Sequence, residues 1–353
     1  MAGGVGSRFW PISRADKPKQ FLDFTAEGKS FLRFTFDRMK AVIPEENILV
    51  VSLPRYREII REQLPELSED NLLLEPYSRN TAPCLTYATY TILKRDPMAV
   101  TAVTPSDLII NRHDVFNETL ANALSYAAGT DALITLGVVP TRPDPNFGYI
   151  QMAGPAEDGR PVKVKTFTEK PDEQLAKVFL ETGEFLWNSG IFVWRADAIR
   201  RELETYAPEI TSLWTGWQEA LGTEAEIPFL ERIYTDMPRT SIDYAVMEKT
   251  DHAWVYPAKF RWADIGNWES LYDYLAHHDD RGNAMNLVNK GLVKECSNNI
   301  VYSGNSRKLL ALRGLDDFIV IDTDDVLMIC PRNEEKLKDF LSQLAMPEFE
   351  EYR

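Results

Sequence analysis

Cysteine and histidine are scarce in this sequence, and their scarcity argues against a zinc site or a disulfide framework. Only three cysteines occur in 353 residues (Cys84, Cys296 and Cys330), and the four histidines show no spacing typical of metal ligands. No histidine lies in the local motif of any cysteine, so each cysteine is most simply a small buried hydrophobic residue.

The sequence also has fewer basic than acidic residues and lacks long apolar runs. The chain has 39 Lys and Arg against 54 Asp and Glu, a net charge of −15, which argues against a nucleic-acid or anionic membrane surface as partner. No apolar run approaches the roughly 18 residues that span a bilayer, and the N-terminus lacks a signal-peptide pattern. We therefore expect a cytoplasmic protein.

Short β-rich runs alternate with helical patterns along most of the chain. The pattern predicts strands over 48–52, 99–103, 133–139 and 191–194, and helices over 54–64, 81–95 and 172–182. This alternation indicates an α/β fold with a mostly parallel central sheet, whose ligands gather beyond the carboxyl ends of the strands. From about residue 286, short strands and turns predict a small β domain with a terminal helix, giving domains of 1–285 and 286–353.

The first twenty residues combine glycines with basic side chains. Gly3, Gly4 and Gly6 would let backbone N–H groups approach a phosphate, and Arg8 and Lys19 add positive charge. The segment matches neither the dinucleotide fingerprint nor a P-loop, which disfavours hydride transfer and Walker-type ATPase chemistry. A plain surface turn is the alternative.

The glycine segment begins almost at Met1, whereas a phosphate-binding loop normally follows directly from a β-strand. We therefore expect that a central strand is missing or truncated ahead of this segment. An N-terminally longer chain should then melt at a markedly higher temperature.

Two aspartates follow β-like stretches. Asp107 comes after the apolar run 99–103, and Asp264 lies in the run Trp-Ala-Asp-Ile-Gly-Asn-Trp. A carboxylate just beyond a strand is a common Mg²⁺ ligand, since magnesium completes its shell with phosphate oxygens and water. The two aspartates could share one metal, although a helix N-cap is the commoner role of such a residue.

Other polar residues suit a sugar phosphate or a nucleotide. Lys170 suits a phosphate, while Glu169 and Asn188 suit sugar hydroxyls. The runs around Gly148 and around Arg79, Asn80 and Thr81 read equally well as a turn and a helix start. Each of these motifs, taken alone, leaves a structural role open.

The joint order of the motifs resembles the mannose-1-phosphate guanylyltransferase family over essentially the whole chain. The matching runs are 2–11 (AGGVGSRFWP), 13–21, 75–83 (EPYSRNTAP), 105–107, 140–150, 167–172 (FTEKPD), 187–190 (WNSG), 241–249 (SIDYAVMEK) and 262–268 (WADIGNW). The resemblance implies a Rossmann-like nucleotidyltransferase domain with a short C-terminal left-handed β-helix. It also implies GMP transfer from GTP to mannose 1-phosphate, with Mg²⁺ as cofactor.

The resemblance also implies roles for matched positions. Catalysis would use Arg8, Lys19, Asp107 and Asp264, and the metal would be held by Asp107 and Asp264. The nucleotide would contact Gly3, Gly4, Gly6, Ser7, Arg8, Lys19, Arg79, Asn80, Thr81 and Asp107. The sugar phosphate would contact Gly148, Glu169, Lys170 and Asn188. The β domain and its terminal helix suggest a homodimer. The alternatives are another hexose 1-phosphate or nucleotide as substrate, or a catalytically silent nucleotide-sugar sensor.

Overall fold

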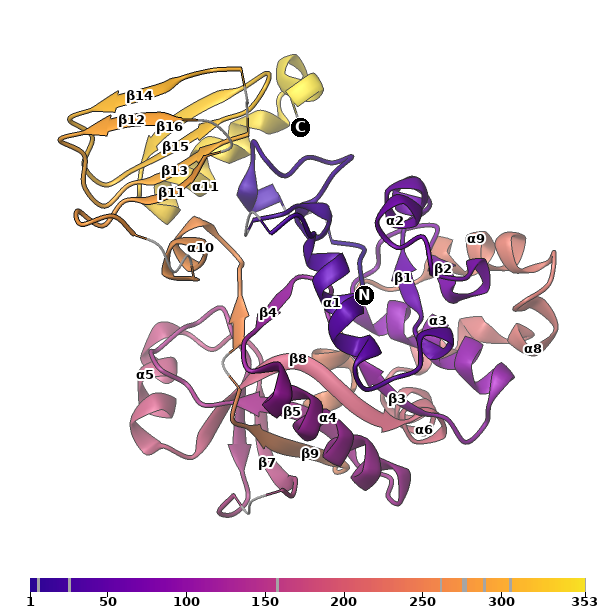
Figure 1. Cartoon of the computed structure of the whole chain (residues 1–353). Helices are drawn as coiled ribbons and strands as arrows, with labels where there is room; N and C mark the ends of the chain where they lie inside the picture. Colours follow the sequence, from indigo (N-terminus) through magenta and orange to yellow (C-terminus); the bar gives the residue numbers. More distant parts are fainter. Residues whose placement is uncertain are drawn as a thin grey trace.

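The computed structural model describes residues 1–4, 7–24, 27–156, 159–260, 262–274, 278–287, 290–304 and 307–352. A large α/β part comes first in the chain, and a smaller β-rich part that ends in an α-helix and two 3-10 helices follows it (Figure 1). No described helix combines the length and apolar character needed to cross a membrane.

A six-stranded sheet forms the centre of the large part. Its strand order is β3-β8-β5-β9-β7-β6. The bounds are β3 (Val100–Val103), β5 (Leu133–Val138), β6 (Tyr149–Met152), β7 (Val162–Thr168), β8 (Phe185–Arg195) and β9 (Ala253–Ala258). The predicted strands 99–103, 133–139 and 191–194 are confirmed as β3, β5 and part of β8.

The directions of these strands correct one prediction. Within this sheet only β5 and β9 pair in parallel, and all other printed neighbours are antiparallel. The α/β class is confirmed, but a mostly parallel sheet is wrong for the described strands. Alternation of strands and helices does not fix strand direction: β6 and β7, for example, are joined by a short link that returns the chain as a hairpin.

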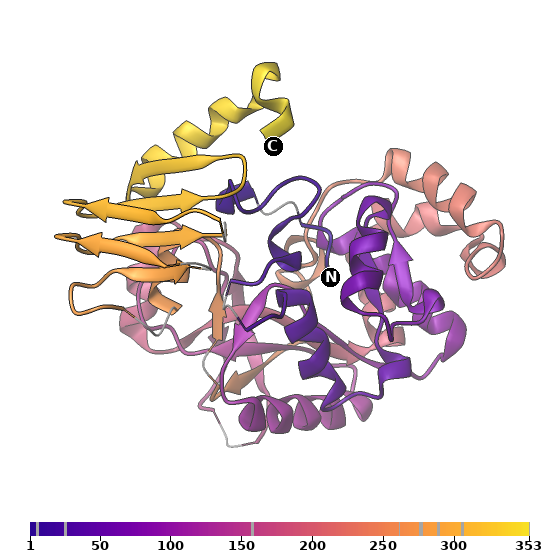
Figure 2. The same cartoon turned by 45° about the horizontal axis from the view of Figure 1, so that its top comes forward.

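Helices cover both faces of the sheet (Figures 1 and 2). Helices α3, α6 and α9 contribute to one large apolar core, and α4 contributes to a second core with β5 and β8. The bounds are α1 (Phe31–Lys40), α2 (Arg57–Gln63), α3 (Thr81–Arg95), α4 (His113–Ala128), α5 (Glu173–Thr182), α6 (Ala196–Tyr206), α7 (Pro208–Thr211), α8 (Trp217–Ala220), α9 (Glu226–Asp236) and α10 (Trp268–Tyr274). All three predicted helices are present as α2, α3 and α5.

Capping side chains explain two of these helix starts. The Asn80 side chain accepts from Thr81 N at the start of α3, with Asn80 at φ 72°, and the Asp172 side chain accepts from Leu175 N at the start of α5. Gly183, at φ 69°, ends α5 in the left-handed conformation that glycine adopts without steric cost.

Two short strand pairs lie outside the six-stranded sheet. Strand β1 (Val50–Ser52) pairs in parallel with β2 (Leu72–Leu74). Strand β4 (Leu108–Ile110) pairs antiparallel with β10 (Trp262–Asp264). The second pair brings together stretches that are far apart in sequence, and it matters for the candidate site.

The C-terminal part stacks parallel strands coil upon coil, as in a β-helix. One sheet has the order β11-β13-β15-β16, and β12 pairs with β14. The bounds are β11 (Ala284–Leu287), β12 (Gly291–Lys294), β13 (Ile300–Ser303), β14 (Leu310–Arg313), β15 (Phe318–Asp322) and β16 (Leu327–Pro331), followed by α11 (Glu334–Ser342). Asn299 ties successive coils, because its side chain donates to Leu315 O and accepts from Phe318 N.

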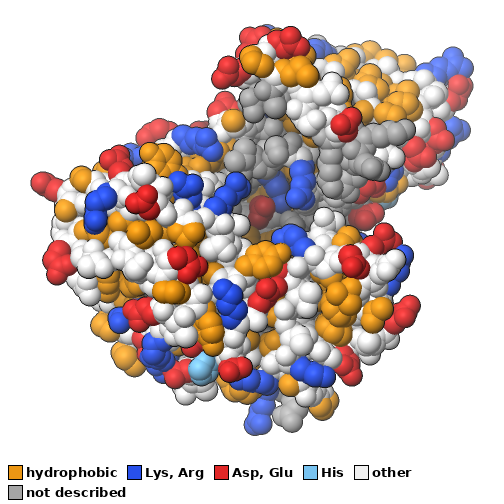
Figure 3. Space-filling view, turned by 180° about the vertical axis from the view of Figure 1, so that it is seen from behind, with side chains coloured by type: hydrophobic (Ala, Val, Ile, Leu, Met, Phe, Trp, Pro, Cys, Tyr) orange, Lys and Arg blue, Asp and Glu red, His pale blue; other side chains and the backbone are white. Residues whose placement is uncertain are grey.

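The C-terminal part packs on the N-terminal loop of the chain. Phe9 and Trp10 share an apolar cluster with Ile300 and Ile319, and Trp10 Nε1 donates to Tyr352 O at 2.6 Å. Figure 2 shows the yellow terminal helices beside the indigo N-terminal loop. Seen from behind, Lys and Arg side chains gather where the two parts meet (Figure 3).

Candidate active site

A buried lysine–aspartate pair marks one end of the candidate site. Lys19 lies in the 3-10 helix η2 (Lys19–Phe21), is 5% exposed, and places Nζ 3.0 Å from Asp107 Oδ2. The rings of Phe9 and Phe31 flank the same Nζ, with centroids at 6.0 and 5.6 Å. Burial works to raise the pKa of Asp107, but the Lys19 charge and hydrogen bond outweigh it, so the pKa is lowered. Asp107 therefore stays ionised at neutral pH.

Asp264 is brought next to Asp107 by strand pairing. In the β4–β10 pair, Asp264 lies opposite Leu108, the residue that follows Asp107. The backbone thus supports the prediction that these two distant stretches meet, although the Asp264 side chain falls outside what the structure describes. No described group of three His, Cys, Asp or Glu residues could hold a metal, but Mg²⁺ needs only one or two carboxylates when phosphate oxygens complete its shell.

The glycine segment lies beside this pair and is held by Gln20. The buried Gln20 side chain donates from Nε2 to both Ala2 O and Gly4 O, each at 3.0 Å. A Cβ at Gly3 or Gly4 would meet nothing within 4 Å, so packing inside the protein does not require glycine there. Open backbone at these positions suits close approach by a ligand.

Three further residues of this segment were predicted to contact the nucleotide: Gly6, Ser7 and Arg8. Arg8 is exposed in the middle of the 3-10 helix η1 (Ser7–Phe9), and Ser7 begins that helix. Gly6 lies outside the described residues. Sequence reasoning gave Gln20 no role, although it sits in the matched run 13–21; its position next to Lys19 was the available signal.

The Arg79–Asn80–Thr81 segment makes contacts within the protein. The Arg79 guanidinium donates to Tyr234 O at 3.1 Å, and Thr81 Oγ1 accepts from Ile242 N at 2.9 Å. Asn80 caps α3, as described above. These contacts hold the segment in place, and its role in nucleotide binding stays a prediction.

The four predicted sugar-phosphate residues meet in one cluster. Gly148 O accepts from Asn188 N at 2.8 Å, and a Cβ at Gly148 would lie 2.3 Å from Glu169 Oε2. Lys170 Nζ forms an ion pair with Glu169 Oε1. The Glu169 side chain is 9% exposed, yet its buried Oε2 accepts no hydrogen bond from any described residue. An unsatisfied buried acceptor of this kind suits a ligand hydroxyl.

Asp243 completes this cluster and was not singled out from the sequence. It begins the π-helical turn η7 (Asp243–Met247), and its Oδ1 accepts from Asn188 Nδ2 at 2.9 Å. Burial, and then the negative charge of Glu169, raise the pKa of Asp243 to about 6. The run 241–249 was part of the resemblance, but no residue in it was given a role, since only folding reveals that it faces Asn188.

Residues on either side of this turn contact the start of α3 and the cluster around Glu169. Thr240 O accepts from Ala82 N at 3.1 Å, and Glu248 Oε1 accepts from Glu169 N at 3.0 Å. The segment from Thr240 to Glu248 therefore contacts both groups of predicted ligand-binding residues.

Comparison with known families defines the class of protein. The nucleotidyl transferase family matches residues 1–281, and a family described as MannoseP isomerase/GMP-like beta-helix domain matches residues 292–344. The protein is thus a nucleotidyltransferase with a C-terminal β-helix domain, as the resemblance predicted.

Two curated relatives narrow this class. Mannose-1-phosphate guanylyltransferase from Klebsiella pneumoniae is 33% identical over 362 residues, which cover 100% of this chain and 75% of the relative. Mannose-1-phosphate guanylyltransferase RfbM from Salmonella typhimurium is 33% identical over 370 residues, covering 100% of this chain and 74% of the relative. The chain belongs to the mannose-1-phosphate guanylyltransferase family and is a sugar-phosphate nucleotidyltransferase.

Solved structures share the fold of this chain. A protein from Thermus thermophilus, titled mannose-1-phosphate geranyltransferase, is 28% identical with a TM-score of 0.87, covering 98% of each chain. A protein from Helicobacter pylori, titled mannose-6-phosphate isomerase, is 27% identical with a TM-score of 0.60, covering 71% of this chain and 96% of that chain. The first similarity extends over both parts of the fold.

Proposed function

We propose that the protein transfers GMP from GTP to mannose 1-phosphate, releasing pyrophosphate and forming GDP-mannose. The observation that carries this proposal is the β4–β10 pairing, which sets Asp264 beside Asp107 next to the buried Lys19. The names of the two curated relatives support the choice of sugar and base.

The reaction would be an in-line displacement at the α-phosphorus of GTP. A phosphate oxygen of mannose 1-phosphate forms the new P–O bond, and the bond to pyrophosphate breaks. A phosphate monoester with a second pKa near ~6 is largely dianionic at pH 7, so no enzymic base is required. The protein must instead bring two polyanions together, with Arg8 and Lys19 neutralising the departing pyrophosphate and Gly3, Gly4, Gly6 and Ser7 lining the phosphates.

Mg²⁺ fits the residues that are present. Two carboxylate residues whose backbones meet, Asp107 and Asp264, match the one or two protein ligands that magnesium takes beside phosphate oxygens. When bound, the ion would supply charge neutralisation between the α-phosphate and the pyrophosphate.

The sugar half of the site follows from the second cluster. Lys170 would bind the phosphate of mannose 1-phosphate, and the unpaired Glu169 Oε2 would accept a sugar hydroxyl. Asn188 and the bare backbone at Gly148 would complete the contact surface. The Arg79–Thr81 segment would lie near the guanosine part of the nucleotide.

The decisive experiment measures pyrophosphate release from a panel of nucleoside triphosphates and hexose 1-phosphates. We expect release with GTP and mannose 1-phosphate, and we expect Asp264→Ala to lower turnover by about 100-fold or more with an altered magnesium dependence. Asp236→Ala, at an exposed position in α9, is the matched control.

Other outcomes of the panel select the alternatives. Release with a different pair of substrates would make this chain a nucleotidyltransferase of other specificity. Binding of GDP-mannose without any release would favour a regulatory sensor. Wild-type kinetics in Asp264→Ala would remove that residue from the metal site.

We also propose a homodimer. Several large apolar side chains of the C-terminal part are exposed, among them Leu292, Leu309, Leu327 and Ile329. Light scattering on the whole chain and on a Leu327→Asp, Ile329→Asp double variant should show a dimer that dissociates; an unchanged mass would contradict this interface.

A further inference from the structure

One face of helix α1 contacts both members of the Lys19–Asp107 pair or their immediate neighbours. Phe31, Thr35 and Arg38 recur at intervals of four and three residues, so their side chains share this face of the helix. All three are at most 6% exposed. The ring of Phe31 lies 5.6 Å from Lys19 Nζ, whereas the other two side chains contact the segment that carries Asp107.

The carbonyl groups of the residues on either side of Asp107 accept hydrogen bonds from this face. Thr35 Oγ1 donates to Ser106 O at 3.3 Å, and Arg38 Nη1 donates to Leu108 O at 3.2 Å. Arg38 Nη2 also donates to Thr35 Oγ1 at 3.0 Å, which leaves the Thr35 hydroxyl proton for Ser106 O. The two side chains thus hold the backbone immediately before and after the aspartate.

Arg38 is a charged side chain that is buried without an ion pair to any described carboxylate. Its guanidinium lies 5.5 Å from the ring centroid of Phe116 in α4, and its Nε has no hydrogen-bond partner among the described residues. Burial lowers the pKa of Arg38 to about 10, so the side chain is still charged at neutral pH. A buried charge of this kind is costly, and an apolar residue would pack at lower cost. What arginine adds is a rigid fork that donates to two acceptors at once.

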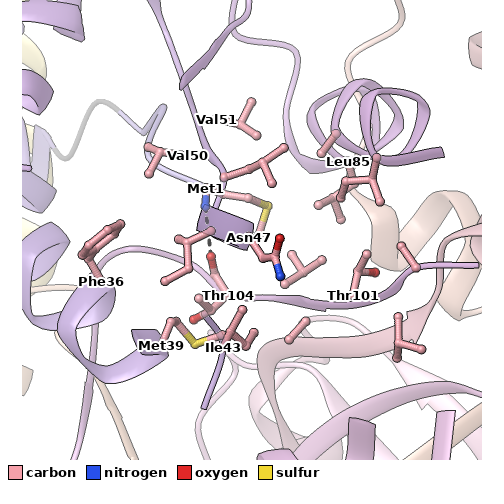
Figure 4. Close-up of a pocket in the computed structure, with 18 of the residues that line it drawn as sticks. Met1, Phe36, Met39, Ile43, Asn47, Val50, Val51, Leu85, Thr101 and Thr104 are labelled. Atoms are coloured by element: carbon pink, nitrogen blue, oxygen red, sulfur yellow. Dashed lines mark hydrogen bonds between the residues drawn. The ribbon is translucent and has the colours of Figure 1, made fainter. Parts of the chain in front are cut away.

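Packing alone does not fix the segment that these hydrogen bonds hold. Phe36 and Met39, on the neighbouring face of α1, line a mostly apolar cavity of about 490 Å³ that also borders Thr104 and Ser106 (Figure 4). On that side the segment lies against empty space rather than closely packed side chains. Its position therefore depends more strongly on hydrogen bonds than that of a fully packed loop.

We propose that Arg38 and Thr35 are positioning residues of the reaction, which fix the backbone around Asp107 so that its carboxylate can hold the metal beside the triphosphate. This inference rests on the proposed function, in which Asp107 is a ligand of Mg²⁺. Leu108 is also the register partner of Asp264, so the hydrogen bond from Arg38 helps to set where the two aspartates meet. Metal ligands must be held within about 0.5 Å of their working positions, so a looser segment weakens the metal site and leaves the sugar cluster intact.

Two substitutions of Thr35 test the hydroxyl by itself. Thr35→Val keeps the branched shape and removes the donor to Ser106 O, whereas Thr35→Ser keeps the hydroxyl. In the free protein, hydrogen exchange should show the amides of residues 106–110 exchanging about tenfold faster in Thr35→Val and at the wild-type rate in Thr35→Ser. Faster exchange in both variants, or in neither, would overturn the proposal.

Two substitutions of Arg38 separate the geometry of the guanidinium from its charge. Arg38→Met removes both, whereas Arg38→Lys keeps the charge without the planar fork. We expect both to lower kcat by about tenfold or more and to raise the Mg²⁺ concentration for half-maximal rate by a similar factor, with the KM for mannose 1-phosphate within about twofold of wild type. Arg33→Met should change none of these constants and is the matched control, because Arg33 lies on the opposite side of α1 and pairs with Asp37.

Calorimetric titration of GTP gives a readout that does not depend on turnover. Mg²⁺ should tighten GTP binding to wild type and to Arg33→Met by about tenfold, and this gain should be lost in Arg38→Met. Wild-type behaviour of Arg38→Lys would show that charge alone is required, and a lower Tm with an unchanged Mg²⁺ dependence in Arg38→Met would show a purely structural role. Either result would overturn the proposal.

Failure of the proposed function would look different from failure of this inference. In that case the wild type would release no pyrophosphate from GTP and mannose 1-phosphate, while the difference in hydrogen exchange between Thr35→Val and Thr35→Ser would persist. If the arginine variants do not fold, the two threonine variants still decide, because their side chains are close in size to the original.

Discussion

Replacing Asp243 by Asn should stabilise the protein at neutral pH while weakening sugar-phosphate binding. The Asp243 carboxylate is partly buried and lies near Glu169, and these two factors raise its pKa from 3.8 to about 6. An asparagine at this position keeps an Oδ1 that accepts from Asn188 Nδ2, but it carries no charge. The substitution therefore isolates the cost of holding a negative charge beside Glu169.

The size and sign of the effect follow from linkage. The pKa of Asp243 is higher in the folded state than in the unfolded state. Its contribution to the free energy of unfolding of the wild type is therefore fully present below about pH 4 and is lost as pH rises through about 6. A shift of this size corresponds to about 3 kcal/mol. Partial solvent exposure of Asp243 and the weaker hydrogen bond to a neutral amide both reduce this value. We therefore expect Asp243→Asn to raise the free energy of unfolding by about 1–2 kcal/mol above pH 7.

Urea unfolding at pH 4.5, 5.5, 6.5 and 7.5 measures this directly. The difference in free energy of unfolding between Asp243→Asn and wild type should grow across the series, whereas Asp236→Asn should give no such trend. Kinetics should show a KM for mannose 1-phosphate that rises by about tenfold, with the KM for GTP little changed. A difference in stability that is constant with pH would refute the reasoning about buried charge.

Two further substitutions test other parts of the site. Gly148→Ala places a Cβ 2.3 Å from Glu169 Oε2, so the carboxylate must move; the KM for mannose 1-phosphate should rise by about tenfold or more in steady-state assays, and an unchanged KM would remove Gly148 from the sugar site. Burial raises the pKa of Glu75, which accepts from Tyr234 Oη, to about 7, so its stabilising contribution is lost as pH rises from 4.5 through 7. The free energy of unfolding of Glu75→Gln, measured in urea relative to wild type, should thus be about 1–3 kcal/mol more favourable at pH 8 than at pH 5. The same pH dependence in the two proteins would contradict this.

Local sequence signals predicted several individual elements of the fold. The helix 81–95 was placed to the residue, since Asn80 and Thr81 give a strong start and the apolar pattern runs unbroken to Arg95. Strand direction was not predictable in the same way, because it depends on which strands become neighbours. The pairing of β8 with β3, β5 and β6 depends on contacts between segments distant in sequence.

The same distinction holds for the candidate site. Lys19 with Asp107, and Glu169 with Lys170, could be chosen because each residue type suits phosphate, metal or sugar chemistry. Asp243 and Gln20 could not, since a carboxylate or amide gains significance only when its partner is known, and those partners are Asn188 and the backbone of Gly4. The contact between Trp10 Nε1 and Tyr352 O, in the C-terminal 3-10 helix Pro347–Tyr352, could not be predicted either, because it joins the two ends of the chain.

Each lysine proposed to bind a phosphate is paired with a carboxylate of the protein: Lys19 with Asp107, and Lys170 with Glu169. In the first pair the carboxylate is also the proposed metal ligand, so a divalent cation and a triphosphate should favour each other, the cation drawing Asp107 away from Lys19 and leaving that lysine to the phosphates. Asp107→Asn removes this competition without removing Lys19.

Calorimetric titration of GTP therefore has an expected sign. Mg²⁺ should tighten GTP binding to the wild type by about tenfold, a typical coupling between two ligands. In Asp107→Asn that gain should disappear, and GTP should bind more tightly than to wild type when Mg²⁺ is withheld, because Lys19 no longer has a carboxylate competing for its charge. Weaker Mg²⁺-free binding in the variant would show that Asp107 orients Lys19 for the nucleotide, and the competition between carboxylate and phosphate would have to be abandoned.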